Sequence, residues 1–166
     1  MEAKTLNIRK ADKKDLSLIQ DMIKHLAAYE QRPQDMTATK EMLSYWLFER
    51  KIACVLIAEY DSTAVGYAVY YPIFGTFSAI GKIYLEDIFI KEEFRHRGFG
   101  RYFLAKIAEL AISEGYSAME WSCLSHNKPS IEFYKKLGAV KESGVEHFKL
   151  DKIGLKAVSE LAKQPS

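Results

Sequence analysis

The chain of 166 residues lacks the cysteine and histidine patterns of disulfide-rich and metal-binding proteins. It has two cysteines, Cys54 and Cys123, which lie far apart in apolar runs without C-x-x-C or histidine spacing. This arrangement predicts buried free thiols in a reducing compartment rather than a disulfide or a zinc site. His25, His126 and His147 share no metal-ligand spacing either, so the sequence predicts no metal site.

Long apolar runs and a strong charge bias are also missing. No run is long enough to span a bilayer, and residues 1–4 do not open a signal peptide, so we expect a cytoplasmic protein without membrane contact. The formal net charge of +2 is too small and too evenly spread to indicate binding to nucleic acid. The length and the absence of low-complexity segments predict one globular domain over residues 1–166.

Two common phosphate-binding motifs are absent. The chain contains no G-x-x-x-x-G-K-[ST], which disfavours nucleotide hydrolysis. The glycine pair Gly98 and Gly100 is followed by Arg101, Tyr102 and Phe103 rather than by the remainder of G-x-G-x-x-G, which disfavours hydride transfer with a dinucleotide.

What is present is a turn rich in arginine and glycine, R-H-R-G-F-G at residues 95–100, between a strand-like run and a helix-like run. Gly98 and Gly100 have no side chain to block a ligand, so successive backbone N–H groups can point at phosphate oxygens beside the positive end of the helix dipole. The turn predicts a ligand that carries phosphates. A tight turn without a ligand is the alternative for so short a motif.

The pattern R-x-x-G-x-G after a strand resembles the acetyl-CoA-binding motif of the GNAT superfamily of N-acetyltransferases. The segment N-K-P-S-I-E-F-Y-K-K-L-G-A at 127–139 resembles the later signature of that superfamily. Y-L-E-D at 84–87, L-A-A-Y-E at 26–30 and F-K-L-D at 148–151 are similar to the spermidine/spermine N-acetyltransferase subfamily, which includes thialysine and small-diamine acetylators. The similarity runs from about Ile8 to about Lys156.

The resemblance implies acetyl-CoA as the cofactor. Backbone N–H groups from His96 to Arg101 would hold the pyrophosphate, backbone from Ile88 to Ile90 would pair with the pantetheine arm as an added strand does, and Asn127 would bond that arm. Alternatively, Asn127 only caps a helix and the arginines are solvated. The predicted cofactor-binding residues are Ile88, Phe89, Ile90, Arg95, His96, Arg97, Gly98, Phe99, Gly100, Arg101, Asn127 and Ser130.

Acetyl transfer from a thioester to an amine requires a neutral amine and a proton for the departing thiolate. Because a primary amine has a pKa near 10, the enzyme must remove its proton at neutral pH. The resemblance makes Glu86 the candidate base, acting through water, and Tyr134 the candidate acid. The alternatives are that Glu86 is a polar residue with ordinary partners or binds the distal ammonium of the substrate, and that Tyr134 is one of many structural tyrosines.

A site for a polyamine needs carboxylates spaced along a groove, because each ammonium must be paired as it leaves water. The resemblance places Tyr29 and Glu30 in the acceptor-binding segment of the subfamily, with Glu120 and Ser122 on a strand that would flank the groove. The substrate-binding residues that it implies are Tyr29, Glu30, Glu86, Asp87, Glu120 and Ser122. Glu30 could instead be a solvated acid at the end of a helix. Adjacent residues of a strand face opposite sides, so Glu86 and Asp87 can both serve the site only if the strand is bulged or splayed there.

Hydrophobic periodicity predicts a mixed α/β fold with a mostly antiparallel central sheet flanked by helices, in the order β-α-α-β-β-β-α-β-α-β. Asp12 is expected to cap the first helix, and Leu43, Trp46 and Leu47 are expected to pack inward from a second. The expected helices begin after Asp12, after Gly100 and after Pro129, and one more covers 39–48. A turn is expected at 60–62 and a loop over 72–81. The expected strands cover 6–9, 52–59, 65–71, 82–90, 118–123 and 145–150.

The resemblance therefore implies an acetyl-CoA-dependent N-acetyltransferase that acts on a primary amine of a small polyamine, diamine or lysine-like molecule. The alternatives are a protein or peptide N-acetyltransferase and a domain that binds acyl-CoA without catalysis. The resemblance also implies a homodimer with acceptor residues near the interface.

Overall fold

The computed structural model describes residues 5–162, so the N-terminal residues on which the signal-peptide expectation rests lie outside the described part. The chain divides into two compact units, Met1–Ser122 and Cys123–Ser166, which are described here one after the other. No helix among the described residues is long and apolar enough to cross a membrane.

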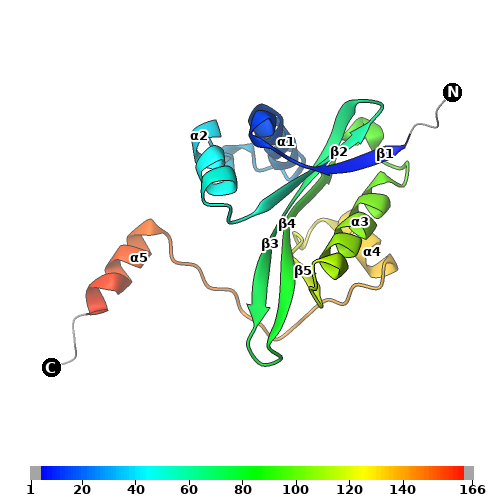
Figure 1. The fold of residues 1–166 in the computed structure, drawn as a ribbon. Helices are drawn as coiled ribbons and strands as arrows, with labels where there is room; N and C mark the ends of the chain where they lie inside the picture. Colours follow the sequence, from blue (N-terminus) through cyan, green and yellow to red (C-terminus); the bar gives the residue numbers. More distant parts are fainter. Residues whose placement is uncertain (1–4, 163–166) are drawn as a thin grey trace. The chain divides into compact units, whose positions relative to one another are not determined.

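The first unit is built on a five-stranded sheet with the strand order β1-β2-β3-β4-β5 (Figure 1). The first four strands pair antiparallel, and β5 is parallel to β4. Helices flank this sheet, as the sequence predicts for a mixed α/β protein. The strands are β1 Leu6–Lys10, β2 Cys54–Tyr60, β3 Thr63–Gly75, β4 Ile80–Ile90 and β5 Met119–Trp121.

The α-helices among the described residues of this unit are α1 Leu16–Tyr29, α2 Lys40–Leu43 and α3 Phe99–Ser113. Asp12 caps the turn that leads into α1, as predicted: its carboxylate accepts from the N–H of Lys14 at 2.7 Å, and Asp15 accepts from the N–H of Asp12 at 2.9 Å. Each bond satisfies a backbone donor that the first turn of a helix would otherwise leave unpaired. Short 3₁₀ turns cover Lys13–Asp15, Pro33–Asp35 and Glu92–Phe94.

The two faces of the sheet have different partners. On one face Tyr67 and Phe89 pack with Ile19 and Met22 of α1 in a buried cluster. Residues that alternate with them along β3 and β4 point to the other face, on which α3 packs its own apolar side. The buried residues of α3 are Phe103, Leu104, Ile107 and Ala111.

The prediction that Trp46 packs inward is wrong. The chain after α2 is a π-helix over Ser44–Glu49, and the indole of Trp46 is 44% exposed, with an edge contact to Tyr45 and the Arg50 guanidinium 5.9 Å away. A π-helix has more residues per turn than an α-helix, so the predicted α-helical face is rotated. Leu43 and Leu47 do pack against the core, as expected.

The predicted loop over 72–81 is also too long. Strand pairing continues to Gly75 opposite Ile80, with Pro72 opposite Ile83. Proline is tolerated here because β2 pairs with β3 only as far as Tyr70, so the missing N–H can lie on the side that has no strand neighbour. The expectation of buried thiols fails for Cys54, which is exposed at the first position of β2.

The second unit contains the helices α4 Lys128–Lys136 and α5 Lys152–Ser159, followed by a 3₁₀ turn over Glu160–Ala162. Pro129 lies in the first turn of α4, and Gly138 follows that helix with a φ of 88°, both as predicted. The strand predicted over 145–150 is wrong.

Residues 145–150 carry the apolar alternation of a strand, yet the described structure pairs them with no other strand. Phe148 is 95% exposed and Val145 is 65% exposed. Directly after this segment Asp151 accepts from the N–H of Gly154 at 2.8 Å and caps α5, which the sequence did not predict. Alternation yields a strand only where a sheet edge is there to pair with it.

Candidate active site

A β-bulge lies at the centre of strand β4. Val69 of β3 is opposite Asp87, whereas the next residue, Tyr70, is opposite Leu85, so Glu86 is the extra residue of β4. A bulge of this kind bends the strand and changes the direction of the side chain that follows. Glu86 and Asp87 can both serve one site only if the strand is bulged or splayed there, and this bulge meets that condition.

The hydrogen bonds show that Glu86 and Asp87 do lie on the same face. Oε2 of Glu86 accepts from the hydroxyl of Tyr71 at 3.0 Å, and Oδ2 of Asp87 accepts from the hydroxyl of Tyr67 at 2.8 Å. Tyr67 and Tyr71 are four residues apart on one strand and therefore point to the same side. Glu86 is exposed and Asp87 is partly buried, so the bulge presents one accessible and one sheltered carboxylate.

Burial dominates the electrostatics of Asp87. Burial is the largest cause, the hydrogen bond from Tyr67 acts against it, and the charges of Glu86 and Glu30 act with it; together they raise the pKa of Asp87 to about 6. Burial and the neighbouring Glu86 carboxylate also raise the pKa of Tyr71 to about 12. Asp87 therefore titrates close to physiological pH, which is typical of groups in functional sites.

The end of α1 contributes the predicted residues Tyr29 and Glu30. Glu30 follows the last residue of the helix, and its charge acts on both Asp87 and Tyr67. The ring of Tyr29 lies against Phe89, with 6.4 Å between centroids. The structure therefore brings the acceptor-binding segment predicted around residue 30 to the carboxylates of β4.

Strand β5 extends the same face. Tyr84, which is stacked on Tyr71, donates to Oγ of the predicted residue Ser122 at 3.0 Å. Glu120 lies opposite Tyr84 and accepts from the ammonium of Lys82. All six predicted substrate-binding residues thus share one face of the first unit. No group of three or more histidine, cysteine, aspartate and glutamate side chains in the described range could hold a metal ion.

The strands β4 and β5 separate next to this site. Their parallel pairing ends at Leu85 opposite Trp121, although β4 continues to Ile90. Within the described structure the edge of β4 beyond Leu85 therefore has no strand neighbour on that side. Such an edge offers main-chain hydrogen-bonding groups to an extended ligand. The backbone of Ile88, Phe89 and Ile90, predicted to pair with the pantetheine arm, lies on this stretch.

The predicted phosphate turn leads directly into α3. Gly98 has a φ of 79° and precedes the helix, whose first α-helical bond runs from the N–H of Tyr102 to the carbonyl of Gly98 at 3.0 Å. No side chain of the described residues caps the start of α3, so the N–H groups of its first turn are left for another acceptor. The predicted residues Phe99, Gly100 and Arg101 form that turn.

Gly100 has no structural requirement for glycine. A Cβ atom there would meet no other atom within 4 Å, and the residue is part of a regular helix, where glycine is less favourable than alanine. Gly98 is different, since its left-handed backbone favours glycine by itself. Packing therefore does not require glycine at position 100, and the predicted role of Gly100 in cofactor binding stays a prediction.

The arginines of the turn have partners within the protein. The Nε of Arg95 donates to the carbonyl of Ile90 at 2.9 Å, and its guanidinium lies 4.3 Å from the ring centroid of Tyr29. The guanidinium of Arg97 lies 5.4 Å from the ring of Phe94. His96 has a φ of 60°, which is uncommon for a residue with a side chain. Arg95 thus links the turn to the predicted acceptor-binding segment.

The second unit carries the remaining predicted residues on α4. The side-chain oxygen of Asn127 accepts from the N–H of Ser130 at 3.3 Å and caps this helix, as the alternative reading of Asn127 expects. Tyr134 is partly buried, with its ring 5.3 Å from that of Phe133. The roles of Asn127 and Ser130 in cofactor binding and of Tyr134 as an acid remain predictions.

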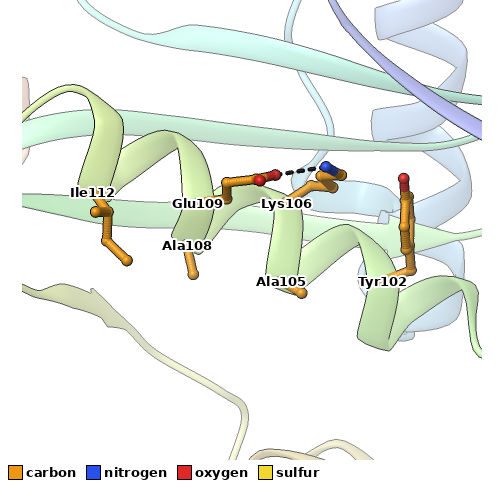
Figure 2. Close-up of a pocket in the computed structure, with 6 residues that line it drawn as sticks. All are labelled: Tyr102, Ala105, Lys106, Ala108, Glu109 and Ile112. Atoms are coloured by element: carbon orange, nitrogen blue, oxygen red, sulfur yellow. Dashed lines mark hydrogen bonds and ion pairs between the residues drawn. The ribbon is translucent and has the colours of Figure 1, made fainter.

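A separate shallow hollow runs along the outer side of α3 (Figure 2). The ammonium of Lys106 is bonded to Glu109 at 2.6 Å and lies 5.8 Å from the ring of Tyr102. The hollow is lined by one helix and does not include the carboxylates of β4. Its lining residues are Tyr102, Ala105, Lys106, Ala108, Glu109 and Ile112.

Sequence reasoning missed the two tyrosines that hold the carboxylates. The sequence predicts Tyr67 and Tyr71 only as part of a strand, and their alternation along β3 places both on the same face as Val69. The period of two was visible in the sequence. The pairing of β3 with β4, and the bulge within it, were not.

The fold and the family match define an acetyltransferase. The profile of the acetyltransferase (GNAT) family matches residues 19–139, and the chain belongs to that family. It is 36% identical over 141 residues to a thialysine N-epsilon-acetyltransferase of Sus scrofa, covering 80% of this chain and 82% of the relative.

Solved structures show the same fold. An integron cassette protein of V. cholerae superposes with a TM-score of 0.77 at 24% identity, over 95% of this chain and 99% of that one. An aminoglycoside N-acetyltransferase in complex with CoA superposes with a TM-score of 0.69 at 18% identity, over 90% of this chain and 97% of the other. GNAT acetyltransferases use acetyl-CoA, and this chain is an acetyltransferase of that kind.

Proposed function

We propose that the acceptor of this enzyme is a primary amine of a small polyamine, diamine or lysine-like molecule. The observation that carries the proposal is the acidic face of the sheet, on which the bulge places Glu86 and Asp87 side by side with Glu30 close to them. Three carboxylates on one face suit a substrate with more than one ammonium group, because each ammonium needs an anionic partner when it leaves water. The thialysine acetyltransferase relative is consistent with such a substrate.

Glu86 is our candidate for the group that removes the amine proton, acting through water. It is the exposed member of the pair, so a substrate can reach it, and the Tyr71 hydroxyl bonded to its Oε2 fixes its direction. The amine would then be neutral, the form in which it can form a C–N bond to a thioester carbonyl as the C–S bond breaks. Tyr134 is the candidate donor of the proton that the sulfur takes up.

Bound acetyl-CoA would supply the acetyl group as an activated thioester. The chain has groups that fit such a molecule: the uncapped first turn of α3 after Gly98 suits the pyrophosphate, and the edge of β4 from Ile88 to Ile90 suits the pantetheine arm. The open space at Gly100 allows the phosphates to approach the backbone closely. Arg97 and Arg101 are candidate charge partners, and Asn127 and Ser130 candidate contacts from α4.

We further propose that the two units act as one catalytic domain, in a cytoplasmic homodimer. The family match runs across the boundary between the units, from residue 19 to residue 139, which supports a single domain. The dimer and the location are supported by the resemblance to the spermidine/spermine subfamily. Sedimentation at micromolar concentration tests the dimer, which a monomeric mass would contradict.

The function is tested by following thiol release from acetyl-CoA across a panel of acceptors. The panel contains spermidine, 1,3-diaminopropane, ornithine, lysine, thialysine, a monoamine of similar length and peptides with a free N-terminus or lysine. We expect the highest kcat/KM among the free diamines, polyamines and lysine analogues. Turnover of peptides alone would contradict the proposal, and so would tight CoA binding without turnover of any acceptor.

A further inference from the structure

Tyr67 lies beneath the acidic face and reaches the sheltered carboxylate of the pair. Its side chain is 0% exposed, and its hydroxyl is 2.8 Å from Oδ2 of Asp87. The ring is fixed on its other sides by Phe89 and by the α1 residues Ile19 and Met22. An ionised carboxylate can only accept hydrogen bonds, so the phenol donates to Asp87 and stabilises its anion.

The other groups around Asp87 act in the opposite direction. Burial, the charge of Glu86 on the same strand and the charge of Glu30 at the end of α1 all favour the protonated form of Asp87. Burial and the nearby carboxylates also raise the pKa of Tyr67 far above its usual value, so its hydroxyl keeps its proton. Arg95, the cation that follows β4, is bonded to the Ile90 carbonyl.

We propose that Tyr67 is a positioning residue that holds Asp87 ionised and fixed in direction, so that this carboxylate can pair with an ammonium group of the acceptor. The inference rests on the proposed function, in which the acceptor carries such a group. A carboxylate has acceptor capacity at both oxygens, so the bond at Oδ2 leaves room for a second partner. Tyr67 itself does not touch the substrate and acts through Asp87.

The substitution Tyr67→Phe tests this role, because it removes the hydroxyl and keeps the buried ring. Without the hydrogen bond Asp87 takes up a proton more readily, so we expect the acidic limb of the kcat/KM profile to move upward by about one pH unit or more. The KM of the amine should rise at pH 6.5 and return toward the wild-type value at pH 8.5. An equal loss of activity at every pH would indicate packing damage alone and would overturn the proposal.

Tyr70→Phe is the matched control. Tyr70 is three residues further along the same strand, is 3% exposed and lies on the opposite face, where its hydroxyl has no hydrogen-bond partner in the described structure. Like Tyr67→Phe, the substitution Tyr70→Phe removes one buried phenolic oxygen. We expect the pH profile of this variant to superimpose on the wild-type profile, and a shift as large as that of Tyr67→Phe would contradict a specific role for Tyr67.

A titration without substrate separates this inference from the proposed function. Carbon NMR of aspartate carboxyl groups, with the Asp87 signal assigned by its loss in Asp87→Asn, should show a midpoint near 6 in the wild type and a higher one in Tyr67→Phe. An unshifted midpoint in an active enzyme would refute the role of Tyr67. A shifted midpoint in a protein that acetylates no amine would refute the proposed function instead.

Discussion

Glu86 and Asp87 are neighbours in the chain and nevertheless face the same side of the sheet. In a regular strand their side chains would point about 180° apart, and one would lie in the core beneath α3. The bulge opposite Val69 and Tyr70 removes this alternation at one position. The result is a pair of carboxylates with unequal exposure, each bonded to its own tyrosine hydroxyl.

Replacing Glu86 with glutamine should lower kcat by about 10²–10⁴-fold, the usual contribution of a general base. The loss should be largest at neutral pH and smaller near pH 10, where much of the free amine is already neutral. A pH–rate profile of Glu86→Gln measures this. Glu109→Gln on α3 is the control, since it breaks only the surface pair with Lys106. A profile of unchanged shape with a raised KM would instead assign Glu86 to ammonium binding.

Replacing Tyr134 with phenylalanine should lower kcat while the Kd of acetyl-CoA changes little, because the phenol is needed when the thiolate leaves. Stopped-flow turnover and calorimetry measure the two quantities separately. Tyr45→Phe, which alters a tyrosine 41% exposed on the π-helix, should leave both unchanged. Equal turnover in Tyr134→Phe and the wild type would remove Tyr134 from the reaction.

The two glycines of the phosphate turn should respond differently to alanine. Gly98→Ala should destabilise the protein by about 1 kcal/mol, because φ there is 79°. Gly100→Ala should leave the free protein as stable or up to about 1 kcal/mol more stable, since the helix gains a better residue and the new Cβ meets open space. Both variants should bind acetyl-CoA more weakly. Thermal melts with and without CoA measure these effects; undiminished CoA affinity in Gly100→Ala would contradict a phosphate site at this turn.

A comparison of variants at Arg95 and Arg97 can show which of the two arginines affects amine binding and which affects CoA binding. Arg95→Gln removes the bond to the Ile90 carbonyl and the stacking on Tyr29, so we expect a higher KM for the amine with little change in the Kd of CoA. Arg97→Gln should show the reverse if its guanidinium reaches the phosphates. Steady-state kinetics with either substrate varied separates the two patterns. A Kd of CoA that rises most in Arg95→Gln would place Arg95 at the cofactor.

Asp87→Asn should make the protein more stable and less active. Because the pKa of Asp87 is about 6 in the folded state and 3.8 in a model compound, the folded protein binds the proton more tightly. The stability that this group contributes is complete below pH 4 and is lost as the pH rises through 6. At pH 7.5 the free energy of unfolding of Asp87→Asn should therefore exceed that of the wild type by about 1–2 kcal/mol. Urea unfolding at pH 4 and 7.5 measures this difference. An equal change in the free energy of unfolding at both pH values would contradict a raised pKa of Asp87.

Local signals predicted most of the elements. The cap at Asp12, Pro129 at the start of α4 and the periodic apolar residues of α3 act within a few residues, so the sequence reveals them directly. The failures were non-local. The segment 145–150 alternates as a strand does but pairs with no strand in the described structure. Trp46 does not lie on the predicted inward face, because residues 44–49 form a π-helix instead of an α-helix.

For the site, the sequence by itself determined the order of chemical groups along the chain: a phosphate turn after a strand, two adjacent carboxylates before it, and a tyrosine on a later helix. It also determined the family, because those motifs and their spacing are local patterns. Only the tertiary structure decided that Glu86 and Asp87 share a face, that Tyr67 and Tyr71 hold them and that Glu30 lies near. Strand register and burial set those relationships, and both depend on contacts between segments that are distant in sequence.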